Sequence, residues 1–299
     1  MTRSETLKKP AILCAIILAL TGCASLDSIP YSPRQTPQSW LQIQPFLEVE
    51  LGKLELILVQ PSSTIFVYLL GILAMAVGLY FFKVQRGQLS RSWWGIALIL
   101  WGLGALFAGT SYQAFSYEIK CAGKEICSWT SWWEVIYLIL SAASIQALVI
   151  SGAYSSCMGK CRKVLLVYAV LEFMLYVVLV TVGVLTLTKF LISFDLLLIV
   201  TAPNILFLFI LNGRRYLKTR NRMDLLLAAT WIWLGLVIGI YYIYLVLGLT
   251  EHFWVQGIWF SENDLLHLGL ISWMAYIALA AAERIRDEPD PPRSTAGGG

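Results

Sequence analysis

The chain has 299 residues, of which 58% are hydrophobic and only 13% are charged, and its formal net charge is +4. About a quarter of the residues in a soluble globular protein are charged, so this composition excludes that class and indicates a membrane protein. The positive charge does not indicate a nucleic-acid partner, because the basic residues gather in short loops between apolar segments, where they set membrane topology. We expect the lipid bilayer to be the main partner.

Residues 1–22 are typical of an export signal, because basic Arg3, Lys8 and Lys9 precede a short apolar run. The four residues that end at Cys23 read Leu-Thr-Gly-Cys and resemble a bacterial lipobox. This resemblance implies that Cys23 is lipidated and becomes the mature N-terminus on the outer face of the membrane. The alternatives are an ordinary cleaved signal and a short uncleaved first helix.

Residues 23–63 form a predicted periplasmic linker that is rich in proline. Within it, the segment Phe46–Val59 places Leu47, Leu51, Leu54 and Leu58 on one helical face, which predicts a helix lying in the membrane interface. The alternating Glu48 and Glu50 fit a strand about as well locally. We favour the interfacial helix.

Seven apolar segments between residues 64 and 283 are long enough to cross a bilayer as helices, which makes the predicted fold an all-α seven-helix membrane bundle. Their continuous apolar character excludes the alternating strands of a barrel. The predicted spans are Thr64–Phe82, Trp93–Ser116, Trp132–Tyr154, Val164–Leu187, Leu191–Leu211, Leu225–Leu247 and Asp264–Ala282.

Basic residues mark alternate loops between these spans. The loops after the first, third and fifth spans carry Lys83, Arg86, Arg91, Lys160, Arg162, Lys163, Arg214, Arg215, Lys218, Arg220 and Arg222, whereas the intervening loops carry Lys120, Lys124 and Lys189. The positive-inside rule then predicts an outer N-terminus and a cytoplasmic C-terminus in a bacterial inner membrane. The tail, residues 284–299, is rich in acid and proline, and we expect it to be disordered.

Two cysteine pairs lie on opposite sides in this topology. Cys121 and Cys127 share a short outer loop, where an oxidising compartment favours a disulfide. Cys157 and Cys161 share an inner loop without enough further cysteine or histidine for a complete zinc site, so free thiols are expected. We predict no metal or other cofactor.

Glu172 is the one carboxylate deep within a predicted span, about 12 Å from the cytoplasmic side by helix rise. A nearby tyrosine or Gln146 of the preceding span is the expected hydrogen-bond partner. Two roles remain open for Glu172, a structural polar clasp or a proton or ion relay.

A second group of polar residues gathers at the predicted outer ends of three spans and is the candidate ligand pocket. Asn263 and His267 are four apart and share a helical face, and the short outer loop makes the second and third spans neighbours. The structural alternative is that these residues only cap helices or pack. The predicted pocket residues are Ser111, Gln113, Glu134, Asn263, Asp264 and His267.

The helix count, direction and three short patches resemble the CREST superfamily of seven-helix membrane hydrolases, which includes alkaline ceramidases and the progestin and adipoQ receptors. The family pattern implies a serine, an acid and three zinc-binding histidines. Ser111 matches the serine and Glu134 could replace the aspartate, but Phe115 and Asn263 stand where two histidines belong, and only His267 remains. With two histidines in the chain, a three-histidine zinc site cannot be built.

These observations support three hypotheses. The first is a non-enzymatic or receptor-like bundle that binds a small molecule or lipid in the outer pocket. The second is a lipid hydrolase in which Glu134 acts as base and His267 as acid or ligand, and the third is ion or proton transport through Glu172. Tryptophans near span ends, Trp254 and Trp259 among them, are interpreted as interfacial anchors rather than as a ligand cage.

Overall fold

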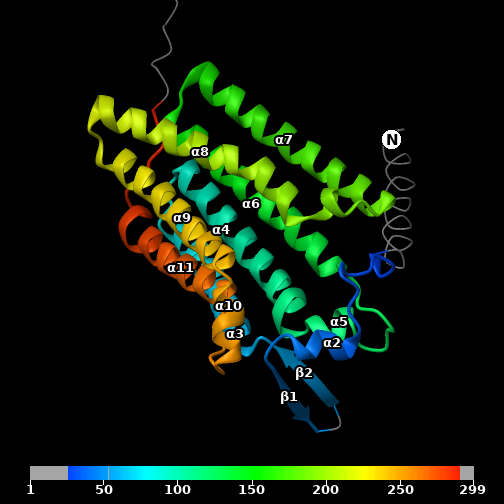
Figure 1. The fold of residues 1–299 in the computed structure, drawn as a ribbon. Helices are drawn as coiled ribbons and strands as arrows, with labels where there is room; N and C mark the ends of the chain where they lie inside the picture. The colour runs from blue at the N-terminus through cyan, green and yellow to red at the C-terminus, as the bar shows by residue number, and fades with distance from the viewer. Residues whose placement is uncertain (1–25, 53, 290–299) are drawn as a thin grey trace, which may run out of the picture.

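The computed structural model describes residues 26–289 except residue 53, and Figure 1 shows that this part of the chain is a helical bundle. Among these residues, seven helices are long and apolar enough to cross a membrane, which confirms the predicted seven-helix fold. They are α3 (Pro61–Lys83), α4 (Leu89–Ala108), α6 (Trp132–Ser156), α7 (Gly159–Thr186), α8 (Phe194–Thr219), α9 (Arg222–Val246) and α11 (Glu262–Tyr276). π-Helical turns extend α4 as η1 (Gly109–Ala114) and α11 as η3 (Ile277–Ala281). The predicted signal and Cys23 lie outside the described residues.

The fifth spanning helix differs most from its predicted bounds. It begins at Phe194, where the Ser193 side chain accepts a hydrogen bond from the backbone of Leu196, and it continues to Thr219 instead of ending at Leu211. Hydropathy detects only the part of a helix that is apolar. The last turns of α8 carry basic side chains, so the helix extends beyond the apolar stretch.

Short elements gather at one end of the bundle, which we call the hairpin end (Figure 1). They are the hairpin strands β1 (Phe46–Leu51) and β2 (Leu54–Val59) and the helices α2 (Pro37–Gln42), α5 (Ser116–Lys120) and α10 (Leu249–Val255). The segment between α2 and the hairpin, together with α10, covers the ends of the long helices.

The predicted interfacial helix over Phe46–Val59 is wrong, because this segment is the antiparallel hairpin β1–β2. Its register pairs Phe46 with Val59 and Glu50 with Glu55, so leucines that would share a helical face divide between two strands. Gly52 has a φ of +68°, which suits a turn and interrupts a helix. Glu118 of α5 accepts a hydrogen bond from the Ile57 backbone at 3.2 Å, and this contact ties the hairpin to the bundle.

Close backbone contact joins α3 to α4. A Cβ atom added at Gly102 would lie 2.6 Å from the Gly71 carbonyl oxygen, and one added at Gly95 would lie 2.9 Å from the Gly78 carbonyl oxygen. Small residues permit this approach, as is common between membrane helices. The interior next to this pair holds stacked aromatic rings, with Trp94 and Trp231 centroids 5.7 Å apart.

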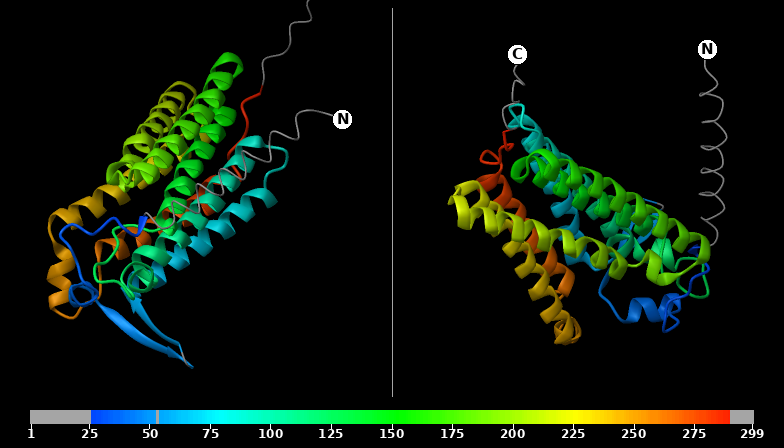
Figure 2. Two further views of the ribbon diagram at one scale, coloured as in Figure 1. Left: turned by 90° about the vertical axis from the view of Figure 1, so that its right-hand side faces the viewer. Right: turned by 90° about the horizontal axis from the view of Figure 1, so that it is seen from above.

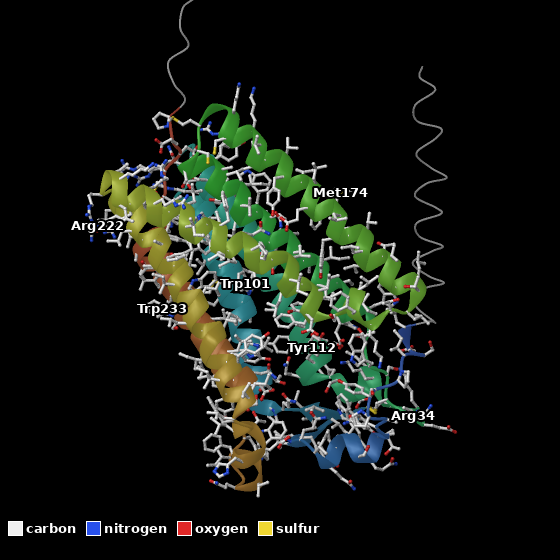
Figure 3. All side chains as sticks on the ribbon, turned by 45° about the horizontal axis from the view of Figure 1, so that its top comes forward. Arg34, Trp101, Tyr112, Met174, Arg222 and Trp233 are labelled. Carbon is white, nitrogen blue, oxygen red and sulfur yellow. A yellow bond between two sulfur atoms is a disulfide. The ribbon has the colours of Figure 1, made fainter. Side chains whose placement is uncertain are left out.

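The helix α7 contributes least to the interior. Much of its surface carries exposed apolar side chains, including Val167, Leu171 and Met174, and Figure 3 shows the Met174 side chain at the outside of the bundle. Such a surface suits contact with lipid tails.

The predicted disulfide between Cys121 and Cys127 is confirmed, and both cysteines are fully buried. The loop that it closes also holds the N-terminal segment. The Tyr31 backbone donates to the Cys127 carbonyl at 3.3 Å, and the Cys127 backbone donates to the Gln35 carbonyl at 2.8 Å. Residues 31–35 are therefore fixed over the hairpin end of the bundle.

The expected disorder of the tail is wrong for its first part, because residues 283–288 form a strap across the end opposite the hairpin (Figure 2). The Ile285 side chain is buried, and the Arg91 guanidinium donates to the Ile285 carbonyl at 2.6 Å. The Asp287 carboxylate accepts hydrogen bonds from the Leu89 and Ser90 backbones, both at 2.8 Å. It therefore satisfies free N–H groups at the start of α4.

Arginines near the ends of α7 and α8 hold the end of the strap. Arg215 of α8 donates to a Glu288 carboxylate oxygen at 2.6 Å and to Asp224 of α9 at 3.1 Å. Arg162 donates to the Glu288 carbonyl at 2.6 Å. Composition alone indicates disorder for this tail, but the basic loops supply partners that an isolated peptide does not have. Residues 290–299 lie outside the described residues.

The Asp287→Ala variant tests the strap. We expect it to lower the free energy of unfolding by about 1 to 2 kcal/mol, because backbone N–H groups of α4 lose their acceptor. Thermal unfolding in detergent measures the change. The matched control is Asp195→Ala, which removes an exposed carboxylate from the first turn of α8. Equal melting temperatures for the two variants would contradict the role of the strap.

Candidate functional site

Two adjoining cavities lie within the described part of the bundle. One has a volume of about 1170 Å³ and lies at the hairpin end, and the other has a volume of about 510 Å³ and lies among the long helices. They are adjacent, because some of the same side chains line both. These shared residues are Val67, Ala108, Tyr137, Phe194, Leu266 and His267.

The two cavities differ in chemistry. The larger one, the polar cavity, is lined by glutamines, acids and aromatic rings, among them Gln113, Glu262 and Tyr112. The smaller one, the apolar cavity, is lined mainly by aliphatic and aromatic side chains such as Trp101 and Leu270. α4 and η1 form one spanning helix, along which Trp101 lies deeper in the bundle than Tyr112 (Figure 3). The lining of the cavities therefore changes from polar to apolar along the bundle.

Several polar atoms that line the polar cavity are buried without a hydrogen-bond partner among the described residues. The Gln113 Oε1, His267 Nδ1 and Trp40 Nε1 atoms all belong to side chains that are at most 7% exposed. The Oε1 atoms of Gln35 and Gln60 are also unpartnered. An unsatisfied buried polar atom costs about 1 to 3 kcal/mol. These lining side chains therefore have hydrogen-bonding capacity that no described residue uses.

The structure divides the predicted pocket residues into separate groups. Gln113, Asn263 and His267 line the polar cavity together. Asp264 instead closes a capping box with Ser261 at the start of α11, and it accepts a hydrogen bond from Ser62 at 3.2 Å. Asp264 therefore positions the helix that carries Asn263 and His267.

Ser111 and Glu134 form a buried network of their own behind the cavity wall. The Ser111 hydroxyl donates to a Glu134 carboxylate oxygen at 2.8 Å and also lies 2.7 Å from the Ser131 hydroxyl. Lys120 of α5 forms an ion pair with the same carboxylate. Both charged side chains are at most 3% exposed, so each neutralises the other in a desolvated position.

The sequence analysis missed the role of Lys120. We counted it as an outer-loop lysine in the topology argument, although its spacing from Glu134 across a short closed loop could have indicated a pair. The ammonium also lies 4.7 Å from the centre of the Tyr112 ring. Tyr112 lines the polar cavity, whereas Lys120 and Glu134 do not.

Aromatic side chains make up much of the polar cavity wall. Trp254 and Trp259, which the sequence predicts to be interfacial anchors, also line this cavity together with Trp40 and Tyr241. Tyr31 joins them from the N-terminal segment, and burial raises the pKa of its hydroxyl, an effect that the Lys120 charge opposes. The Tyr31 hydroxyl therefore keeps its proton near neutral pH.

Glu172 lies apart from both cavity linings. Asn204 of α8 donates to both carboxylate oxygens at 3.0 Å, and Gln146 of α6 donates to one of them at 3.1 Å. The expected contact with Gln146 is present, whereas Asn204 was not anticipated. The Tyr168 hydroxyl donates to the Asn204 side chain at 2.9 Å. The carboxylate thus joins three helices.

Cys157 and Cys161 are free thiols, the first buried and the second exposed. Burial, followed by the neighbouring Cys161, raises the pKa of Cys157 to about 12. Among the described residues, no group of three or more His, Cys, Asp and Glu side chains could hold a metal ion.

The fold and the site belong to a segment that a known family model covers. A model described as a family of unknown function (DUF6962) matches residues 63–286. The chain belongs to this family. The DUF6962 segment includes nearly all of the seven spanning helices and ends within the strap, whereas the hairpin and α2 precede it. No curated protein and no solved structure matches the chain.

The Lys120→Met variant tests the buried ion pair of this DUF6962 protein. We expect a loss of about 3 to 5 kcal/mol in unfolding free energy, because Glu134 is left charged and buried, and a partial recovery in the Lys120→Met/Glu134→Gln double variant. Chemical unfolding in detergent measures both.

The matched control removes an exposed pair. Lys124 contacts Asp27 at 2.8 Å, and Lys124→Met should cost no more than about 1 kcal/mol. Equal losses for Lys120→Met and Lys124→Met would mean that the buried pair has no special role.

Proposed function

We propose that this protein binds an amphipathic molecule within the membrane, with the polar part of the ligand in the polar cavity and its hydrocarbon chain in the apolar cavity. The observation that carries this proposal is the change of lining between two adjacent cavities. A lipid or a lipid-like small molecule has the same order of polar and apolar parts. Ligand sites are usually apolar clefts of about 300 to 1000 Å³ with a few convergent polar groups, and the apolar cavity, at about 510 Å³, has a volume in that range.

The geometry favours binding over hydrolysis. The hydrolase hypothesis, including the one implied by the CREST resemblance, needs the Glu134 carboxylate to act as a base on a substrate. Lys120 and Ser111 contact that carboxylate, and Glu134 is not among the residues that line the polar cavity. A general base must reach the proton that it removes.

Transport through Glu172 has less support than a structural role. The amides of Gln146 and Asn204 hold the Glu172 carboxylate between α6, α7 and α8, and neither cavity includes it. Polar side chains that bond across membrane helices commonly contribute to packing. Glu172 therefore suits a clasp that joins α7, the helix with the least buried surface, to the bundle.

The proposed orientation places the polar cavity at the outer face of a bacterial inner membrane. The basic loops lie at the strap end, so the positive-inside rule favours a cytoplasmic strap and an outer hairpin. A signal followed by a lipidated Cys23 would anchor the N-terminal segment on the same outer side. The disulfide at the hairpin end suits an oxidising compartment.

The Ala105→Phe variant tests ligand binding. Ala105 lines the apolar cavity and is buried, so a phenyl ring there occupies space that a hydrocarbon chain would fill. Native mass spectrometry of the detergent-purified protein should show a retained amphipathic molecule in the wild type and an occupancy about tenfold lower in Ala105→Phe, since overpacking costs about 1 to 3 kcal/mol.

Ala275→Phe is the matched control, because Ala275 is exposed on α11 and lines neither cavity. Its occupancy should equal that of the wild type. Equal occupancy in the wild type and both variants would contradict the proposed binding site.

Thiol labelling of Cys161 tests the orientation. Cys161 is exposed at the strap end, whereas Cys157 is buried and its pKa of about 12 keeps that thiol protonated. A membrane-impermeant maleimide should label Cys161 only after cell lysis, and the signal should be absent in Cys161→Ser. The exposed hairpin position in Glu50→Cys should be labelled in intact cells. The reverse pattern would show that the bundle has the opposite orientation.

A further inference from the structure

We propose that the polar cavity recognises a positively charged ammonium headgroup, which makes the ligand a cationic amphipath. This inference rests on the proposed binding function and specifies the ligand class of the same site. Among the described residues that line the polar cavity, none is lysine or arginine, whereas Glu251 and Glu262 contribute carboxylates. A cavity with this charge balance attracts cations and repels phosphate or carboxylate headgroups.

The lysine in contact with the cavity-lining rings does not alter this balance. Lys120 lies over the Tyr112 ring but does not itself line the cavity, and it forms an ion pair with Glu134, so the two charges cancel. The cavity itself is therefore left with the two acids of α10 and α11.

The aromatic rings supply a second recognition element. The rings of Tyr31, Tyr112, Tyr241, Trp254 and Trp259 all line the polar cavity. Ring faces carry partial negative charge and attract a cation that lies over them. Lys120 already demonstrates this affinity, because its ammonium lies 4.7 Å from the Tyr112 ring centre and 5.8 Å from that of Tyr31.

The unpartnered atoms point to a ligand that donates hydrogen bonds. The Oε1 atoms of Gln35, Gln60 and Gln113 are acceptors, and Gln113 is only 5% exposed. The Gln60 amide nitrogen donates to Gln44 at 3.1 Å, which leaves its oxygen as the free group. An ammonium supplies N–H or polarised C–H donors, whereas a sulfate or phosphate oxygen does not. The Trp40 Nε1 donor remains for an uncharged oxygen of the ligand.

Three probes with the same chain separate charge from chain binding: octyltrimethylammonium, octanol and octyl sulfate. Equilibrium dialysis against the full-length protein in neutral-lipid nanodiscs, with empty nanodiscs subtracted, measures the affinity for each. We expect the ammonium probe to bind about tenfold more tightly than octanol, equivalent to about 1.4 kcal/mol, and octyl sulfate to bind most weakly.

Charge and ring variants test the two recognition elements separately. Glu251→Gln/Glu262→Gln should reduce the affinity for the ammonium probe about tenfold and leave that for octanol unchanged. Trp259→Leu should also reduce the affinity for the ammonium probe and leave that for octanol unchanged. The matched controls are Glu125→Gln, an exposed acid outside the cavity, and Trp233→Leu, an exposed ring on α9.

The outcomes separate this inference from the proposed function. Equal affinities for the three probes in the wild type, with all three weakened by Ala105→Phe, would overturn ammonium selectivity and leave amphipath binding intact. Tighter binding of octyl sulfate than of the ammonium probe would overturn the inference directly. Absence of saturable binding by any probe, together with no effect of Ala105→Phe, would overturn the proposed function itself.

Discussion

The cost of an unpaired polar group away from water governs the arrangement of this bundle. Hydrocarbon offers no hydrogen bonds, so the backbone forms helices and buried side chains find partners. Lys120 and Glu134 neutralise each other, and Gln146 and Asn204 hold Glu172. Partners are not found everywhere among the described residues: buried polar atoms without one occur on side chains that line the polar cavity, such as Gln113, and also elsewhere in the bundle, such as on Tyr176.

The close pairing of α3 and α4 explains part of where that space lies. Glycines bring their backbones into contact, so no cavity separates these two helices. The apolar cavity is instead bounded by this pair on one side and by helices such as α8 and α9 on the other, with Trp101, Phe209 and Ile232 in its wall. A pair of helices in tight contact thus provides a rigid wall against which a hydrocarbon chain can pack.

The two ends of the bundle are held by different chemistry. At the hairpin end, a disulfide and backbone hydrogen bonds fix residues 31–35 over the polar cavity. At the other end, arginines bind the carbonyls and carboxylates of the strap, and Asp287 caps α4. The strap uses the same basic residues that set topology, so one set of charges serves both orientation and the connection between helices. Since the cavities lie away from the strap, the strap supports the site only through the helices that it joins.

The sequence by itself determined the seven helices and the disulfide, because long apolar runs and cysteines six residues apart depend on local chemistry, and it named Gln146 as one of two possible partners of Glu172. It also identified Gln113, Asn263 and His267, since polar residues near span ends share one membrane level. Only the tertiary structure decided which of these polar residues face a cavity. That depends on the orientation of each helix about its axis and on which side chains lie close enough to pair. In the folded bundle, Lys120 forms an ion pair with Glu134, Asp264 caps α11, and Arg215 binds the strap. None of these contacts follows from periodicity or composition. The hairpin was likewise decided by the turn at Gly52 and the contact with Glu118, where helical and strand patterns fitted the sequence about equally.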